Sequence, residues 1–378
     1  MEEYRVLETI RKHAQGLALQ SIERTGSGQN NDIWIIDSAF IFRFPKYAEG
    51  IKQLEKEAEL LKRFADRLPL KVPRPEYCVL EPASGQAFMG YLRIDGVPLE
   101  AEQLERLKDA ATLDRIAGQL AGFLKALHGT DMGCCPDLSA SQYDPFQEWK
   151  ELYRRLQDKL YRFMIPEARV RTNRHFEDFF AAKDHARIVP SLIHGDFGGC
   201  NILHDLAERK VTGIIDIGSA QLGDAAIDYA ALYASYGGGF FQRVMKLNSE
   251  IRDMTGRVRF YKGTFALQEA LFGLEQGDDD AFRSGLATVN EWLNEGSQER
   301  ITAPGFFEII ISEKISLRTP DLLRINLEVI EMRMFIGRSD ARLAVRETPR
   351  PDSASRQPWL DGKNPLSSRH GQLPKNYI

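Results

Sequence analysis

The sequence is poor in cysteine and has no excess of positive charge. Only four of its 378 residues are cysteines, and their positions show neither the spacing of zinc ligands nor the density of a secreted disulfide scaffold. The formal net charge of -4 leaves no positive surplus to neutralise a nucleic-acid backbone or an anionic membrane surface. We therefore expect reduced thiols, and neither nucleic acid nor membrane as a partner.

Long apolar runs are also missing. No stretch approaches the roughly 20 apolar residues that a membrane-spanning helix needs, and residues 1–4 open the chain without the apolar core of an export signal. The chain is 43% hydrophobic and 28% charged, the balance of a globular protein, and it is long enough for two lobes. These features predict a cytoplasmic protein, which we expect to be a monomer.

Residues 1–94 are predicted to form a small β-rich lobe. Alternating apolar runs on both sides of a turn at 37–39 predict a β-hairpin. Residues 51–64 carry apolar side chains at three-and-four spacing, which predicts an amphipathic helix after the second strand. A last strand over 88–94 then leaves the lobe through a turn rich in Gly and Pro.

Residues 95–300 are predicted to form a larger, mainly helical lobe. Short β-like runs at 191–193 and 211–215 interrupt the helical pattern, and each leads directly into polar residues and glycine. Strand ends of this kind position exposed loops that carry chemistry. The two parts together predict an α+β fold. The segments with helical periodicity are 113–128, 144–164 and 229–293.

The end of the chain has a different pattern. Thr319 and Pro320 have the residue types of a helix start, which predicts a helical extension over 301–336. Residues 337–378 are rich in Arg, Pro and Ser and lose all periodicity. We expect them to form a loosely ordered tail.

Residues with chemical potential are concentrated in the run HGDFGGCN at 194–201 and in a later aspartate ahead of a glycine. An Asp, an Asn five residues later and a further Asp repeat the layout of kinase catalytic and metal-binding loops. Phosphoryl transfer needs a carboxylate that orients the attacking hydroxyl and takes its proton, and we assign this role to Asp196. Mg²⁺ prefers hard oxygen ligands, which Asn201 and Asp216 supply.

This segment resembles the catalytic loop of the aminoglycoside and macrolide phosphotransferases. The resemblance spans roughly residues 20–295. It implies a bilobal protein-kinase-like fold and an enzyme of antibiotic resistance that phosphorylates a hydroxyl, with Mg²⁺ and with ATP or GTP as the donor. The further matching segments are 42–46, 124–128, 213–216, 223–224 and Asp228.

The phosphates of a nucleotide also need a cation in the first lobe. Arg43 stands where the resemblance to kinases places the strand lysine, and its guanidinium can grip two oxygens at once. Glu57 borders the apolar stripe of the predicted helix and is expected to pair with Arg43. The other interpretation makes Arg43 a solvated strand residue and Glu57 a surface acid. A turn containing Gly26, Ser27 and Gly28 could cover the phosphates with backbone N–H groups.

The resemblance also implies a hinge that reads the nucleotide base, around Met89, Tyr91 and Arg93. Such a hinge uses mainly backbone groups, so the sequence leaves the choice between ATP and GTP open.

Three more polar residues near the catalytic loop have both a structural and a functional interpretation. His194 could act as a base, but a histidine at this place in the loop is expected to bind the backbone and hold the turn. Asp224 and Asp228 could touch the substrate, and the favoured interpretation is that they anchor the loop and cap the next helix.

The function that fits these residues best is that of a small-molecule kinase acting on an aminoglycoside-, macrolide- or metabolite-like alcohol. A protein kinase is disfavoured, because the chain between Gly218 and Asp224 is too short for an activation segment. The second alternative is a catalytically silent nucleotide-binding module on the same fold. Retention of the expected base and both expected metal ligands argues against it.

Overall fold

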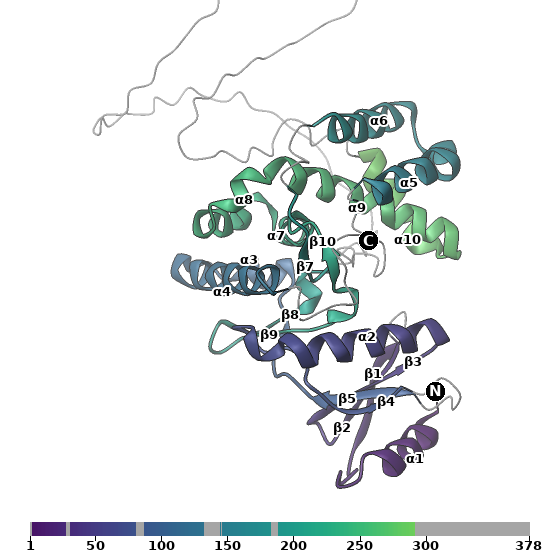
Figure 1. Cartoon of the computed structure of the whole chain (residues 1–378), viewed down its shortest axis with the longest axis vertical. Helices are drawn as coiled ribbons and strands as arrows, with labels where there is room; N and C mark the ends of the chain where they lie inside the picture. The colour runs from purple at the N-terminus through teal and green to yellow at the C-terminus, as the bar shows by residue number, and fades with distance from the viewer. Residues whose placement is uncertain are drawn as a thin grey trace, which may run out of the picture. The chain divides into compact units, whose positions relative to one another are not determined.

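A computed structural model describes residues 2–27, 31–80, 87–131, 144, 146–182 and 188–291 (Figure 1). All of them belong to one compact unit, which comprises residues 1–301 together with 370–378. A second unit, residues 302–369, lies outside the described residues. The predicted extension over 301–336 and the predicted tail over 337–378 therefore lie outside them too.

An antiparallel sheet of five strands in the order β1-β2-β3-β5-β4 forms the first part of the chain. The predicted hairpin is confirmed: β2 and β3 pair in a register that sets Ile33 opposite Arg43. The turn between them carries positive φ angles at Asp37 and Ser38. The strands are β1 Ile22–Ser27, β2 Asn31–Ile36, β3 Phe40–Pro45, β4 Pro75–Val79 and β5 Phe88–Leu92.

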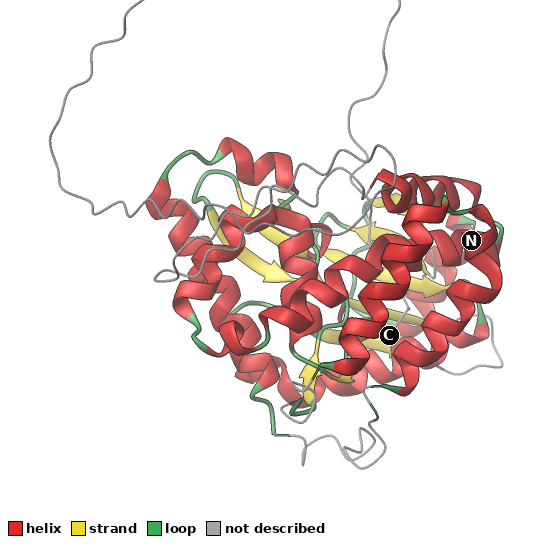
Figure 2. Ribbon diagram, turned by 90° about the horizontal axis from the view of Figure 1, so that it is seen from above, coloured by secondary structure: helices red, strands yellow, loops and turns green. Residues whose placement is uncertain are grey.

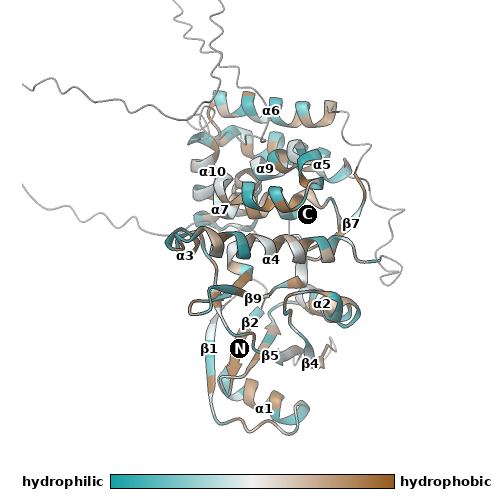
Figure 3. Ribbon diagram, turned by 90° about the vertical axis from the view of Figure 1, so that its left-hand side faces the viewer, coloured by the Kyte–Doolittle hydropathy of each residue, from teal (hydrophilic) through white to brown (hydrophobic). Residues whose placement is uncertain are grey.

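Helices α1 (Glu3–His13) and α2 (Ala48–Phe64) lie on opposite sides of this sheet (Figures 1 and 3). Alternate strand residues point to opposite faces, so Phe42 and Phe44 pack with α1. Arg43 between them projects to the side of α2. Helix α2 was predicted from its spacing and is confirmed, whereas α1 was not anticipated.

Helices dominate the second part of the chain, as predicted (Figure 2). A three-stranded sheet in the order β6-β8-β9 and the pair β7 with β10 are set among them. The strands are β6 Val97–Pro98, β7 Ser191–Ile193, β8 Ile202–Asp205, β9 Lys210–Ile214 and β10 Gln221–Gly223. The helices are α3 Ala101–Arg106, α4 Ala110–His128, α5 Gln147–Arg155, α6 Pro166–Ala181, α7 Ala226–Leu247, α8 Glu250–Asp253, α9 Thr255–Gln276 and α10 Asp279–Glu291.

The helix predicted over 144–164 is not continuous. Helix α5 is followed by a π-helical turn at Leu156–Leu160 and then by a 3₁₀ turn. The hydroxyls of Tyr153 and Tyr161 both donate to Oδ1 of Asn173 on α6, at 2.8 Å and 2.6 Å. The π-helical turn holds more residues than an α-helical turn, so the side chains after it point in different directions from those of a continuous α-helix. The contacts with Asn173 could not be predicted from the spacing of apolar residues within 144–164.

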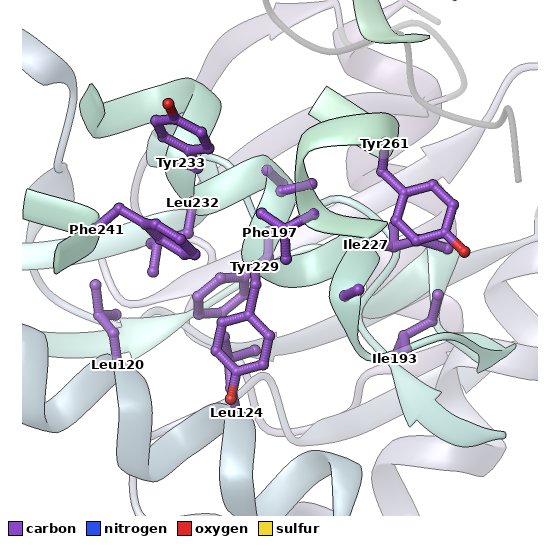
Figure 4. Close-up of a cluster of buried hydrophobic side chains, with 14 of the residues drawn as sticks. Leu120, Leu124, Ile193, Phe197, Ile227, Tyr229, Leu232, Tyr233, Phe241 and Tyr261 are labelled. Atoms are coloured by element: carbon purple, nitrogen blue, oxygen red, sulfur yellow. The ribbon is translucent and has the colours of Figure 1, made fainter. Parts of the chain in front are cut away.

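Among the described residues, the largest hydrophobic core includes the region where α4 and α7 meet the strands β7 and β8. Phe123 of α4 stacks on Phe197, at 5.6 Å between ring centroids, and Tyr229 and Phe241 of α7 are fully buried nearby (Figure 4). The loop that carries Asp196 is therefore fixed on a packed base. Within the described part of the chain, no helix combines the length and the apolar character needed to cross a membrane.

Candidate active site

The loop between β7 and β8 brings Asp196 and Asn201 together. Both residues are buried. The side-chain nitrogen of Asn201 donates to the backbone carbonyl of Asp196 at 2.8 Å and to its carboxylate at 2.9 Å. This holds the amide nitrogen on the Asp196 side and turns the amide oxygen, the atom that could bind a metal, the other way.

Asp216 reaches the same place from the end of β9. The pairing of Ile202 with Ile214 sets the start of β8 beside the end of β9, and the backbone N–H of Ile215 donates to the carbonyl of Asn201 at 2.9 Å. Asp216 itself has a left-handed backbone, with φ 64° and ψ 58°. Such a conformation is uncommon for a residue with a side chain and often marks a functional position.

Arg43 joins the two parts of the site. Its guanidinium binds both oxygens of Glu57, at 2.8 Å and 2.9 Å, and lies 3.4 Å from a carboxylate oxygen of Asp216. Burial alone would lower the pKa of Arg43, but the carboxylates of Glu57 and Asp216 outweigh it and raise that pKa above its ordinary value. The predicted ion pair is confirmed, and the interpretation of Arg43 as a solvated strand residue is wrong.

Gly218 lets the turn after Asp216 lie close to Glu57 of helix α2. A Cβ atom placed on Gly218 would lie 3.1 Å from a carboxylate oxygen of Glu57, closer than most Cβ contacts. The turn after Asp216 can therefore pack against α2 because it lacks a side chain there.

His194 and Asp228 hold the beginning of the catalytic loop. The fully buried carboxylate of Asp228 accepts from the backbone N–H groups of His194 and Gly195, at 2.8 Å and 2.9 Å, and contacts Nε2 of His128 at 2.9 Å. The ring of His194 contacts the carbonyl of Ile215 through Nε2 and accepts from the backbone N–H of Asp196 through Nδ1. Both ring nitrogens are engaged by the backbone, as the structural interpretation predicted.

Asp224 likewise binds the protein itself. It accepts from the backbone N–H of Ala226 at 3.0 Å, from Nε of Arg257 at 2.7 Å and from the hydroxyl of Tyr261 at 2.9 Å. These contacts begin α7 and tie it to α9, which is the anchoring role favoured from the sequence.

The side chains of Met89 and Tyr91 in the predicted hinge pack under α2 against Leu54 and Ala58. Burial raises the pKa of the Tyr91 hydroxyl to about 12. Strand β5 lies between β3 and β4, so the backbone of these two residues faces strand neighbours on both sides. Arg93 is exposed, and its N–H donates to the carbonyl of Ala39 at 2.7 Å. Met89 and Tyr91 of the predicted hinge thus lie in an inner strand of the sheet, and Arg93 follows the end of that strand.

The predicted phosphate-covering turn is wrong for its first two residues. Gly26 and Ser27 still belong to β1, where they pair with Ile33 and Asp32 of β2. Gly28 lies outside the described residues. The sequence pattern placed the turn at the first glycine, but strand pairing with β2 continues past it.

The chemistry of the donor atoms fits Mg²⁺. Among the described residues there is no cluster of three or more His, Cys, Asp or Glu side chains that could hold a metal by themselves. Mg²⁺ at a nucleotide site is commonly held by one or two protein oxygens, with phosphates and water completing the octahedron. Asn201 and Asp216 offer that number of oxygens from neighbouring strand ends.

Comparison with known families identifies the family of the chain. A model of the phosphotransferase enzyme family matches residues 21–261. The chain belongs to this family. The viomycin phosphotransferase of Streptomyces vinaceus is 28% identical over 263 residues, covering 67% of this chain and 88% of the relative.

Solved structures of phosphotransferases share the fold. A GDP complex of a mutant aminoglycoside 2'-phosphotransferase-IIIa has a TM-score of 0.72 and 26% identity, over 78% of this chain and 98% of that one. The GDP and kanamycin complex of APH(2")-IIIa has a TM-score of 0.69 and 25% identity, over 76% and 98%. Macrolide 2'-phosphotransferase type I, at 20% identity and a TM-score of 0.57 over 76% and 96%, shows the fold alone. The predicted kinase-like α+β fold is confirmed.

Sequence reasoning missed two residues of α7: Ser235, which contacts the catalytic loop, and Tyr236, which contacts Leu99 beside it. Ser235 accepts from the backbone N–H of Gly199, and Tyr236 donates to the carbonyl of Leu99. A usable signal was present, because Ser235 follows Asp228 by two helical turns and so lies on the same face of α7.

Proposed function

We propose that this enzyme transfers the terminal phosphate of ATP or GTP to a hydroxyl of a small molecule, with Asp196 as the base and Mg²⁺ held by Asn201 and Asp216. The observation that carries the proposal is the side-chain contact of Asn201 with Asp196. It is supported by the backbone hydrogen bond from Ile215 to Asn201, which brings the end of β9 to the start of β8, and by the short distance between Arg43 and Asp216. Kinase chemistry needs a base, metal ligands and a phosphate-binding cation in one place.

Each side chain has a task that follows from its contacts. Asp196 orients the acceptor hydroxyl and takes its proton on the carboxylate, which the amide of Asn201 holds in place. Arg43 binds phosphate oxygens while Glu57 fixes its guanidinium. When bound, Mg²⁺ neutralises charge on the phosphates. The end of β1 at Gly26 and Ser27 and the segment around Arg93 after β5 are the remaining parts of the proposed nucleotide site.

The names of the relatives support the substrate classes. The similar proteins include a viomycin phosphotransferase and structures with GDP, kanamycin or streptomycin. We infer that the acceptor is an antibiotic or a metabolite of aminoglycoside or macrolide type, which gives the enzyme a role in antibiotic resistance. We further propose a cytoplasmic monomer that binds small molecules. The net charge of -4 leaves no positive surplus for nucleic acid or an anionic membrane.

The deciding experiment is a nucleotide-consumption screen of hydroxylated acceptors with ATP, GTP and Mg²⁺, followed by two variants on the best acceptor. Asp196→Ala should lower kcat by about 10²–10⁴, the usual contribution of general base catalysis, while nucleotide still binds. Asp216→Ala should remove the effect of Mg²⁺ on nucleotide binding.

Asp158→Ala is the matched control, because Asp158 is an exposed carboxylate that pairs with Arg154 away from the site. Its kinetics should equal those of the parent. An Asp196→Ala enzyme as fast as the parent would show that the base is assigned wrongly. A parent that binds nucleotide but phosphorylates no acceptor would favour the silent-module alternative.

A further inference from the structure

Helix α7 binds the catalytic loop at its far end as well as at its beginning. The backbone N–H of Gly199 donates to the hydroxyl oxygen of Ser235 at 3.2 Å. At the beginning of the loop, Asp228 of the same helix accepts from two backbone N–H groups. Seven residues separate Asp228 from Ser235, which is two helical turns and about 10 Å along the axis. One rigid element therefore holds both ends of the segment that carries Asp196.

The next residue of α7 ties in a third part of the chain. The hydroxyl of Tyr236 donates to the carbonyl of Leu99 at 2.6 Å, just after strand β6. Leu99 in turn donates its N–H to Ile202, the first residue of β8, at 2.7 Å. Burial, with the nearby Glu100 and Cys200, raises the pKa of Tyr236 well above its ordinary value, so the hydroxyl stays a donor.

Gly199 lies where the three segments meet. A Cβ atom on Gly199 would stand 2.6 Å from the carbonyl oxygen of Leu99 and 3.3 Å from the hydroxyl of Tyr236. Any other residue there would push the loop away from α7 and from Leu99. The close packing at this point is therefore specific to glycine.

The helix breaks directly after these contacts. Gly237 has φ 70° and ψ 177° inside α7, a conformation that L side chains rarely adopt. Nothing lies within 4 Å of a Cβ placed on Gly237, so conformation rather than space requires the glycine. The regular helix thus ends at the pair of residues that reach the loop and Leu99.

We propose that Ser235 and Tyr236 are positioning residues that set the Mg²⁺ ligand Asn201 against the base Asp196. The link is short, because Gly199, Cys200 and Asn201 form one 3₁₀ turn in which the N–H of Asn201 donates to Gly198 at 3.0 Å. Releasing Gly199 frees this turn and lets the amide of Asn201 rotate away from Asp196. The inference rests on the proposed function, because it takes Asn201 as a ligand of Mg²⁺ and Asp196 as the base.

The test measures the metal contribution to nucleotide binding. The affinities of ADP and GDP are determined by calorimetry with Mg²⁺ and again with EDTA, for the parent and for Ser235→Ala, Tyr236→Phe and the double variant. We expect the Mg²⁺-dependent gain in affinity to shrink about tenfold in Ser235→Ala, the usual effect of losing a residue that orients a metal ligand. Ser235→Thr keeps a hydroxyl and should restore the gain.

Tyr161→Phe is the matched control. It removes a partly buried tyrosine hydroxyl that donates to Asn173, on helices away from the loop. It should lower the melting temperature as Tyr236→Phe does, yet leave the Mg²⁺-dependent gain unchanged. Melting temperatures of all variants separate a loss of folding from a loss of positioning.

The outcomes distinguish the two proposals. If the parent shows the gain and both Ser235→Ala and Tyr236→Phe show the same gain, the positioning role is refuted while the proposed function stands. If Tyr161→Phe reduces the gain as much, the effect is general destabilisation and the positioning role is again refuted. A parent that binds nucleotide equally with and without Mg²⁺ overturns the metal site, and the positioning role with it.

Discussion

Two buried arginine–carboxylate pairs in this protein have nearly the same local geometry. Arg43 and Glu57 are 2.8 Å apart with side-chain exposures of 9% and 1%, and Arg257 and Asp224 are 2.7 Å apart with exposures of 7% and 2%. A tyrosine adjoins each pair: Tyr91 lies beside Arg43, and Tyr261 donates to Asp224.

The pairs differ in how their charges are matched. Asp224 binds one arginine, and its oxygens also accept from the hydroxyl of Tyr261 and the backbone N–H of Ala226. We call Arg257 and Asp224 the closed pair, because the carboxylate is bound by neighbouring groups of the protein. Arg43 instead serves two carboxylates, because Asp216 lies 3.4 Å away with 19% of its side chain exposed. Burial is therefore alike in the two pairs. They differ in that two carboxylates, Glu57 and Asp216, share Arg43, whereas Arg257 binds Asp224.

The largest expected effect concerns the closed pair. Arg257→Met should lower the free energy of unfolding by about 3–5 kcal/mol, because it leaves the carboxylate of Asp224 buried without its counter-charge. Urea denaturation of this variant, of Asp224→Asn and of the double variant measures the coupling. The double variant should be more stable than the sum of the two single losses predicts, and simple additivity would show that the pair is not coupled.

A smaller effect is expected from the tyrosine of the closed pair. Tyr261→Phe removes one hydrogen bond to a charged group and should cost about 1.5–3 kcal/mol of unfolding free energy. Nucleotide affinity should stay that of the parent. Tyr91→Phe gives the opposite pattern, with altered nucleotide affinity, because its hydroxyl adjoins the arginine of the proposed phosphate site. Equal effects of Tyr261→Phe and Tyr91→Phe on nucleotide affinity would contradict the assignment of only the Arg43–Glu57 pair to the nucleotide site.

The smallest and sharpest change is Arg43→Lys. The charge beside Glu57 is kept, so stability should change little, but an ammonium cannot bind two oxygens of Glu57 and reach Asp216 in a fixed plane. We expect kcat/KM to fall about tenfold, which corresponds to about 1.4 kcal/mol. Unchanged kinetics would mean that the arginine acts only as a point charge.

Local patterns predicted the parts of the fold that local sequence determines. The β2–β3 hairpin, helix α2 and the loop with Asp196 follow from alternation, three-and-four spacing and a compact motif. Helix α1 was missed because only Val6, Thr9 and Ile10 are buried in it, which leaves a thin apolar pattern among charges. The π-helical turn was missed because it packs against α9, more than a hundred positions further along the chain, where Lys159 pairs with Glu275.

The site was predictable to the same extent. Asp196 and Asn201 stand in one short motif, so their contact could be inferred from the sequence. The Arg43–Glu57 pair was inferred from the place of Glu57 beside the apolar stripe of the predicted helix. The contact of Asp228 with His128 joins residues that lie 100 positions apart, and the contact of Ser235 with Gly199 spans 36. Distances of this kind are set by helix packing, which periodicity in one sequence does not encode.

The central place of β5 in its sheet also bears on inhibitor design. A compound that competes with nucleotide meets no backbone group at Met89 or Tyr91 that is clear of β3 and β4, so its hydrogen-bonding scaffold has to engage the chain after Leu92. A substituent that grows inward instead encounters the Tyr91 hydroxyl and the Arg43 guanidinium behind it. Potency would then come from displacing the contact between Tyr91 and Arg43. Resistance mutations at Tyr91 would disturb the arginine that we propose to bind phosphate.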